Sequence, residues 1–68
     1  MQPSEIFELI IKADERLKYA TPDKAEARAG QARELLTQAR LEAEAIGNTA
    51  LVEQADRRLA DLETLGGS

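Results

Sequence analysis

The side chains that most enzymes use for catalysis are scarce in this sequence. It contains no histidine and no cysteine, which removes the most frequent general base and the strongest protein nucleophile. Its serines are Ser4, at the predicted start of a helix, and Ser68, at the last position, and neither has a neighbour that would activate it. We therefore expect a protein that is not an enzyme and has no small-molecule substrate.

The carboxylates are the remaining groups that could hold a metal ion, and their spacing argues against such a site. Glu42 and Glu44 are two residues apart on a predicted helix, so they point to different faces. Zinc sites normally use cysteine or histidine ligands, and di-iron sites in helix bundles use Glu-x-x-His motifs. We expect neither a metal nor another cofactor.

Asp14 is the most unusual charged residue, because it lies among Ile10, Ile11 and Leu17 near the apolar side of a predicted helix. It could bind a partner protein. It could instead lie at the rim of the core and pair with Lys18 four residues on, a contact worth about 0.2–0.5 kcal/mol. We favour the pair with Lys18.

The charge distribution excludes other classes of partner. The net charge is −4, from 13 acidic and 9 basic residues, and both signs are spread along the whole chain. Nucleic-acid binding needs a basic patch that the sequence does not contain. No apolar run approaches the roughly 20 residues that span a bilayer, and the N-terminus does not resemble a secretory signal. We expect a cytoplasmic protein that binds neither nucleic acid nor membrane.

Proline and glycine divide the chain into three predicted helices, at residues 4–20, 23–46 and 48–65. The residues that mark their ends are Ser4, Thr21, Pro22, Gly47 and, as alternatives for one cap, Asn48 or Thr49. The second helix would begin within about two residues of the first, which forces an antiparallel hairpin. Because nothing alternates with a period of two, we expect an all-α, three-helix up-down-up bundle with the second helix in the middle. It forms one domain over residues 1–65, followed by a flexible tail at 66–68.

The second predicted helix carries an apolar stripe built mostly of alanine. Its members alternate spacings of four and three: Ala25, Ala29, Ala32, Leu36, Ala39, Ala43 and Ile46. The outer helices carry bulkier stripes, with Ile6, Ile10, Ala13 and Leu17 in the first and Val52, Ala55, Leu59 and Leu62 in the third. Large side chains that face small ones fill a helix interface densely, so we expect both outer helices to pack on the alanine stripe. We interpret Gly30 as a point of close backbone approach, with a kink or a flexible point as the alternative.

The predicted second helix is longer than its neighbours, so part of its surface should stay uncovered in a single chain. Leu35 and Leu41 flank the alanine stripe, and one of them could face outward. A chain of this size is near the lower limit for a core that is stable alone. We therefore expect a homodimer that buries this face of the second helix. Tyr19, Leu35 and Leu41 are the candidate partner-binding residues, although Tyr19 could simply close the end of the bundle.

Residues 35–66 resemble tetratricopeptide-type helical repeats over about half of the chain. The residues that match the first helix of such a repeat pattern are Leu36, Ala39, Ala43, Gly47 and Asn48. Those that match the following helix are Leu51, Ala55, Leu59, Ala60 and Leu62. A second, weaker likeness is to microtubule-interacting-and-trafficking domains, which are three-helix domains of similar size.

Both families bind peptide segments or helices in grooves between helices, so the resemblance implies tetratricopeptide-like packing and an interaction module. The sequence thus predicts a small protein–protein interaction module, an adaptor or regulator that docks a partner helix. The alternative is a structural oligomer whose only partner is itself.

Overall fold

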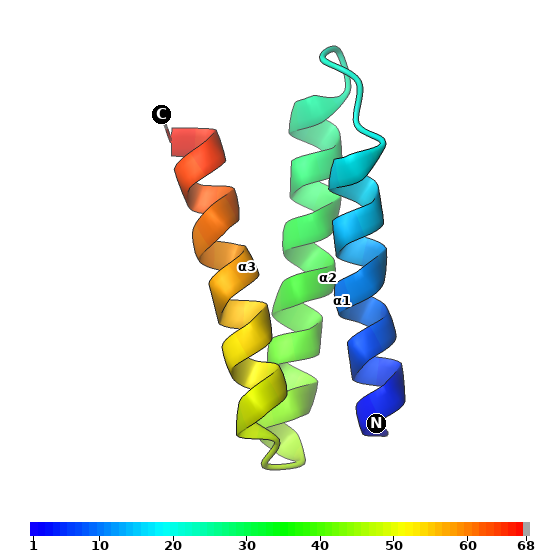
Figure 1. Ribbon diagram of the computed structural model, residues 1–68, viewed down its shortest axis with the longest axis vertical. Coiled ribbons are helices and arrows are strands. Elements are labelled where there is room, and N and C mark those ends of the chain that lie inside the picture. The colour runs from blue at the N-terminus through cyan, green and yellow to red at the C-terminus, as the bar shows by residue number, and fades with distance from the viewer. Residues whose placement is uncertain (68) are drawn as a thin grey trace.

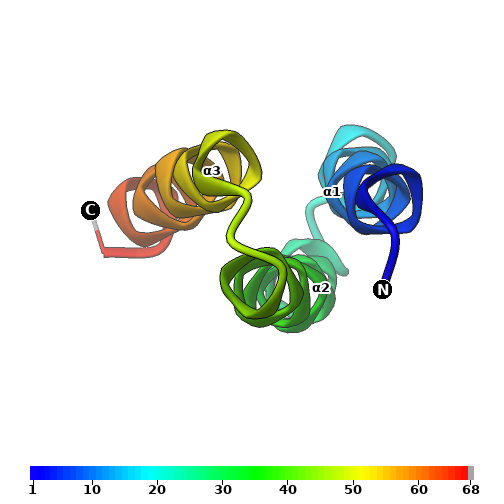
Figure 2. The same cartoon turned by 90° about the horizontal axis from the view of Figure 1, so that it is seen from below.

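The chain forms three α-helices in an up-down-up arrangement: α1 at Pro3–Lys18, α2 at Ala25–Ala45 and α3 at Thr49–Gly67 (Figure 1). The structure, a computed structural model, describes the backbone of residues 1–67 and the side chains of residues 1–64. Both α1 and α3 pack against α2, whereas they touch each other only sparsely (Figure 2). The all-α three-helix prediction is confirmed. α3 runs two residues past its predicted end at 65, to Gly67. Ser68, the last residue of the predicted tail, lies outside the described residues, and the flexibility of the tail stays a prediction.

The first helix begins earlier than the sequence suggested. Its N-cap is Gln2, and Pro3 occupies the first turn, where a missing N–H costs nothing. The Glu5 carboxylate accepts a hydrogen bond from the Gln2 backbone N–H at 3.2 Å, which satisfies a group that the helix itself leaves free. Ser4 lies inside the helix, so its predicted role as the cap was wrong. Because Gln2 and Glu5 bond to each other at the helix end, α1 begins at Pro3, before its predicted start.

The second helix begins later than predicted, because Thr21 and Pro22 form a turn instead of a helix start. The Thr21 hydroxyl donates to the Asp23 carboxylate at 2.6 Å, and the Lys24 N–H bonds to the Thr21 carbonyl at 2.9 Å. With its side chain engaged in the turn, Thr21 does not cap α2, and Lys24 takes the N-cap position. The helix therefore has 21 residues, against 16 in α1 and 19 in α3. Its surplus length is smaller than predicted.

The connection between α2 and α3 agrees with the prediction. Gly47 adopts a left-handed conformation with φ of 69°, and the Asn48 N–H bonds back to the Ala43 carbonyl at 2.9 Å. This pattern closes a helix end by satisfying its free carbonyls. The Asn48 side chain then accepts a hydrogen bond from the Leu51 N–H at 3.2 Å, which caps the start of α3.

The core confirms the middle of the alanine stripe but not its ends. Fully buried residues of α2 are Ala32, Leu36, Ala39 and Ala43, packed against Ile6 and Ile10 of α1 and Leu51 and Leu62 of α3. The exposed residues at the two ends are Ala25 and Ile46. Ala25 comes directly after the Thr21 turn, and Ile46 comes directly before the Gly47 turn. Large side chains therefore meet small ones over the central and C-terminal turns of α2, as far as Ala43.

Gly30 does not mark a close approach between helices, so that interpretation was wrong. A Cβ atom built at this position meets no heavy atom within 4 Å outside the helix's own backbone and the chain neighbours. Its φ angle is also ordinary, because Gly47 is the glycine with positive φ among the described residues. Alanine would fit at position 30 without strain.

We expect Gly30→Ala to raise the free energy of unfolding by about 0.5–1 kcal/mol, because alanine loses less conformational entropy in a helix. Urea denaturation followed by circular dichroism measures this. Gly47→Ala is the matched control and should lower stability by about 1–2 kcal/mol, because its left-handed backbone disfavours a Cβ atom. Destabilisation by Gly30→Ala would show that the backbone around Gly30 is more crowded than described.

Candidate protein-binding groove

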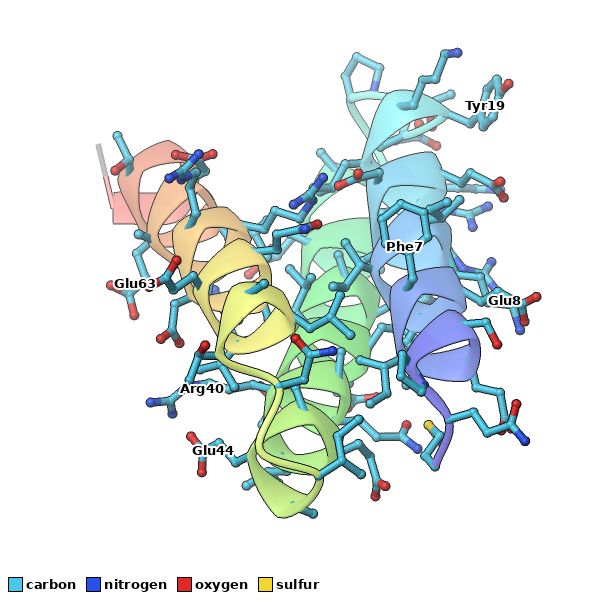
Figure 3. All side chains as sticks on the ribbon, turned by 60° about the horizontal axis from the view of Figure 1, so that its bottom comes forward. Phe7, Glu8, Tyr19, Arg40, Glu44 and Glu63 are labelled. Carbon is cyan, nitrogen blue, oxygen red and sulfur yellow. The ribbon has the colours of Figure 1, made fainter. Side chains whose placement is uncertain are left out.

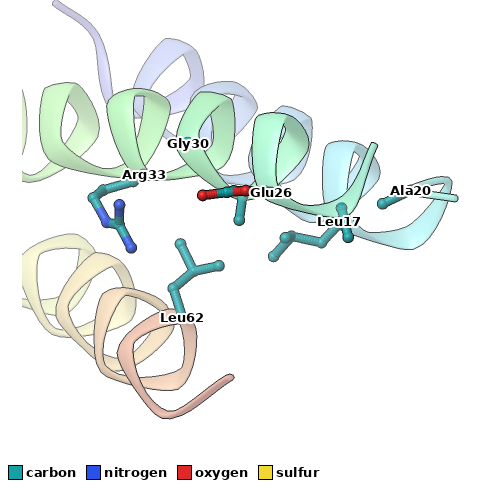
Figure 4. Close-up of a pocket in the computed structure, with 8 residues that line it drawn as sticks. Leu17, Ala20, Glu26, Gly30, Arg33 and Leu62 are labelled. Atoms are coloured by element: carbon teal, nitrogen blue, oxygen red, sulfur yellow. The ribbon is translucent and has the colours of Figure 1, made fainter. Parts of the chain in front are cut away.

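An open cavity of about 650 Å³ lies where α1 and α3 diverge along the N-terminal half of α2. In Figure 1 the C-terminal end of α3 leans away from α2 and α1, so that the helices are furthest apart beside the start of α2. The close-up in Figure 4 shows Leu17 of α1 and Leu62 of α3 pointing into this space from opposite sides. We call the cavity and its walls the groove.

The floor of the groove is made of small residues because the alanine stripe of α2 continues beyond the part that α1 and α3 cover. Ala25, Ala29 and Gly30 line it, and none of the three is fully buried. Small side chains let another backbone or a bulky side chain come close to the helix axis. Unpartnered, this stretch of α2 remains open to solvent.

Charged side chains border the groove on the α2 side. Glu26 and Arg33 are seven residues apart, two helical turns, so they lie on the same side of α2. Both are exposed and carry opposite charges. The groove thus combines an apolar interior with a polar rim, which is the usual composition of a site that binds another protein.

An ion pair between α1 and α3 crosses the middle of the bundle. Arg58 donates from Nε to both carboxylate oxygens of Asp14, at 3.0 and 3.1 Å, and from Nη1 to the Gln54 carbonyl at 3.4 Å. The predicted partner of Asp14, Lys18, was therefore wrong. The Nζ atom of Lys18 instead lies 5.6 Å from the centroid of the Tyr19 ring. A pair between residues 44 positions apart cannot be found from i, i+4 spacing.

A second ion pair joins α2 to α3. Arg40 contacts Asp56 of α3 and also Glu44, one turn further along α2, at 3.5 Å. Figure 3 shows Arg40 and Glu44 projecting on the side of α2 that lies beneath α3. The two interhelical pairs connect α3 to both other helices, and their side chains are one third to one half exposed.

The three predicted partner-binding residues lie on separate surfaces. Tyr19 is 70% exposed beyond the end of α1, beside a polar hollow that also involves Lys12 and Arg28. Leu35 is half-buried and packs against the core. Leu41 is 59% exposed, on the face of α2 opposite the buried alanines. The structure does not bring them together into one site.

Sequence reasoning missed the residues that shape the groove. Leu62 is buried in the core, as its stripe predicted, and Leu17 is half-buried against it. That both residues also border an open cavity could not be predicted, because a periodic pattern shows which side of a helix is apolar but not whether a neighbour covers it. For the same reason Gly30, which also lines the cavity, was assigned to a helix contact. Phe7 and Ile11 lie beside the apolar stripe of α1, and the structure leaves them 43% and 41% exposed. The sequence signal for this exposure is that both residues lie off the main apolar stripe of α1.

Comparison of the chain with known protein families, curated proteins and solved structures finds no match. Among residues 1–64, no three acidic side chains converge in a way that could hold a metal ion. Within the described part of the chain, no helix has the length and apolar character needed to cross a bilayer. The groove is therefore interpreted from its own geometry.

We expect the Asp14–Arg58 pair to show a coupling energy of about 0.5–1 kcal/mol, which falls as salt is added, because both side chains are partly exposed. A double-mutant cycle with Asp14→Asn and Arg58→Met, followed by urea denaturation, measures it. The matched cycle between Asp14 and the neighbouring Arg57 should give no coupling. Equal coupling energies in the two cycles would mean that Asp14 does not pair specifically with Arg58.

Proposed function

We propose that this protein is a helical protein–protein interaction module, an adaptor or regulator whose groove docks an amphipathic partner helix. The observation that carries the proposal is the separation of α1 from α3, which leaves the small-residue floor of α2 uncovered between Leu17 and Leu62. A cavity of about 650 Å³ can accept several side chains of a docked helix. Helix-in-groove binding uses apolar anchors at helical spacing, which such a floor would accommodate.

The resemblance of residues 35–66 to tetratricopeptide-type repeats supports the same function, because those repeats bind segments in grooves between helices. The outer face of α2 offers less for binding. Within α2, Leu41 is the one large apolar side chain that is exposed. Of its four neighbours one turn away, Thr37, Gln38 and Glu44 are polar and Ala45 is small. A homodimer through that face would bury one leucine per chain at its centre. The proposed binding surface is therefore the groove.

Site-specific photocrosslinking in the organism of origin tests this function. A benzoylphenylalanine at Ala25, which lines the groove, should crosslink to a defined protein that mass spectrometry identifies. The matched control places the same group at Gln38, which is exposed on the outer face of α2. The crosslinked segment, made as a peptide, should bind the wild type at least about tenfold more tightly than Ala29→Arg, which puts a charged side chain on the groove floor.

Two outcomes would contradict the proposal. One is equal crosslinking from positions 25 and 38, which would mean contact without a preferred surface. The other is a peptide that binds wild type and Ala29→Arg with the same affinity while both keep the same helical content.

A further inference from the structure

A second hollow in the molecule, of about 440 Å³, lies between the C-terminal turns of α1 and the start of α2. It shares no lining residue with the groove. One side is formed by α1 and its C-cap, whose lining residues have the spacings that put side chains on one side of a helix: Lys12, Glu15, Arg16 and Tyr19. The other side is formed by Arg28 of α2. Because most of these side chains are cationic, we call this site the basic hollow.

The cations of the basic hollow have no carboxylate partner among the described side chains. Ion pairs form elsewhere in the bundle, through Arg40 and Arg58. None of the ion pairs between described side chains involves Lys12, Arg16 or Arg28. The single carboxylate that lines the hollow leaves three positive charges against one negative charge there. Converging like charges repel one another, and an anion placed among them would remove this repulsion.

Arg28 gives the basic hollow a partly fixed donor. Its side chain is half-buried, whereas those of Lys12 and Arg16 are exposed. The apolar stem of an arginine can lie along a neighbouring helix while its guanidinium stays at the surface. A planar guanidinium presents its donors in a rigid fork, so less conformational entropy is lost for each hydrogen bond that it forms.

The chain order hides this cluster. Along the sequence the cations alternate with carboxylates, so no basic patch is visible there. The hairpin between α1 and α2 brings Lys12, Arg16 and Arg28 to one hollow, while Glu26 of the same turn of α2 lines the groove. Folding therefore separates the charges of α2 between two sites.

We propose that the basic hollow binds the phosphate group of a phosphate monoester. Such a group carries about −1.5 to −2 charges near neutral pH and three strong acceptor oxygens, which matches three cations and one carboxylate. A guanidinium can bind two of these oxygens at once, and a Lys ammonium and a Tyr hydroxyl are further donors. A carboxylate ligand, with one charge and two oxygens, would leave part of this donor set unused.

The overall charge favours a compact ligand over an extended polyanion. The chain carries a net charge of −4, so the surface beyond the hollow repels a nucleic acid or an anionic membrane. The hollow of about 440 Å³ is larger than a phosphate group alone and leaves room, beside Tyr19, for the group that carries the phosphate. This site is separate from the proposed function, because no residue of the groove takes part in it.

Nuclear magnetic resonance titration of the isotope-labelled full chain with inorganic phosphate, at constant ionic strength, tests the inference. We expect saturable shifts of the backbone amide signals near residues 12–19 and 28, with a dissociation constant of about 10 mM or below. Arg28→Met should raise this constant about tenfold, because it removes a guanidinium that can hold two phosphate oxygens. Arg57→Met is the matched control, because it removes one positive charge from an exposed residue of α3 that does not line the hollow. It should change the constant by less than about twofold.

Two monoesters then distinguish the source of the phosphate. Phosphoserine in a short, otherwise uncharged peptide represents a phosphorylated protein, and glycerol phosphate represents a free small molecule. The monoester that binds more tightly identifies the source, and Arg28→Met should weaken its binding more than Arg57→Met does.

Three outcomes would overturn the inference. Phosphate could cause no saturable shifts up to about 50 mM, sodium chloride at the same ionic strength could cause the same shifts, or the two arginine variants could weaken binding equally. Circular dichroism checks the helical content, and Arg16→Met, which changes an exposed side chain, replaces Arg28→Met if that variant unfolds. Crosslinking from position 25 tests the groove independently of all three outcomes.

Discussion

The arrangement of the three helices depends on the small side chains along one face of α2. This face contains the fully buried residues Ala32, Ala39 and Ala43. Because their side chains are small, large residues of α1 and α3 can come close to the backbone of α2. Helices pack when the side chains of one fill the spaces on the other. Because α1 and α3 share one side of α2, they lie next to each other on that side (Figure 2). They are held to each other chiefly through α2.

This constraint also explains the open groove. The buried part of the alanine face covers the central and C-terminal turns of α2, where Ile6, Ile10 and Leu51 gather around it. Towards the start of α2, α3 leans away, and Ala29 and Gly30 have no neighbour that covers them fully. A core with three large, fully buried side chains leaves a small margin of stability, since chains of this size bury a limited fraction of their surface. Filling the groove would add to the same core, so binding and folding are linked.

Local chemistry in the sequence predicted much of the fold. Gly47 followed by Asn48 identified the second turn, because a left-handed residue and a capping amide satisfy the helix ends between them. The heptad spacing of Ala32, Leu36 and Ala39 identified the buried face of α2. The start of α2 was misplaced because Thr21 could serve either a helix cap or a turn, and its bond to Asp23 decides for the turn.

The site depended on features that a single sequence does not contain. Asp14 had a plausible local partner in Lys18, yet its ion pair is with Arg58 on a helix 44 residues away. Leu17 and Leu62 fit the core pattern, and only the angle between α1 and α3 makes them walls of a groove. Gly30 was interpreted as a point of close backbone approach, but a Cβ atom at this position would meet no neighbouring atom. Periodicity predicts which side of a helix is apolar, and tertiary geometry decides how much of it is covered.

The claim that small side chains on α2 set the spacing of the helices is tested most directly by enlarging one of them. Ala39→Leu should lower the free energy of unfolding by about 1–3 kcal/mol, because the buried face has no room for the added atoms. The same change at Ala27, which is exposed on α2, should alter stability by less than about 0.5 kcal/mol. If urea denaturation shows that Ala39→Leu is as stable as the wild type or Ala27→Leu, the helices are not held at the distance that alanine sets.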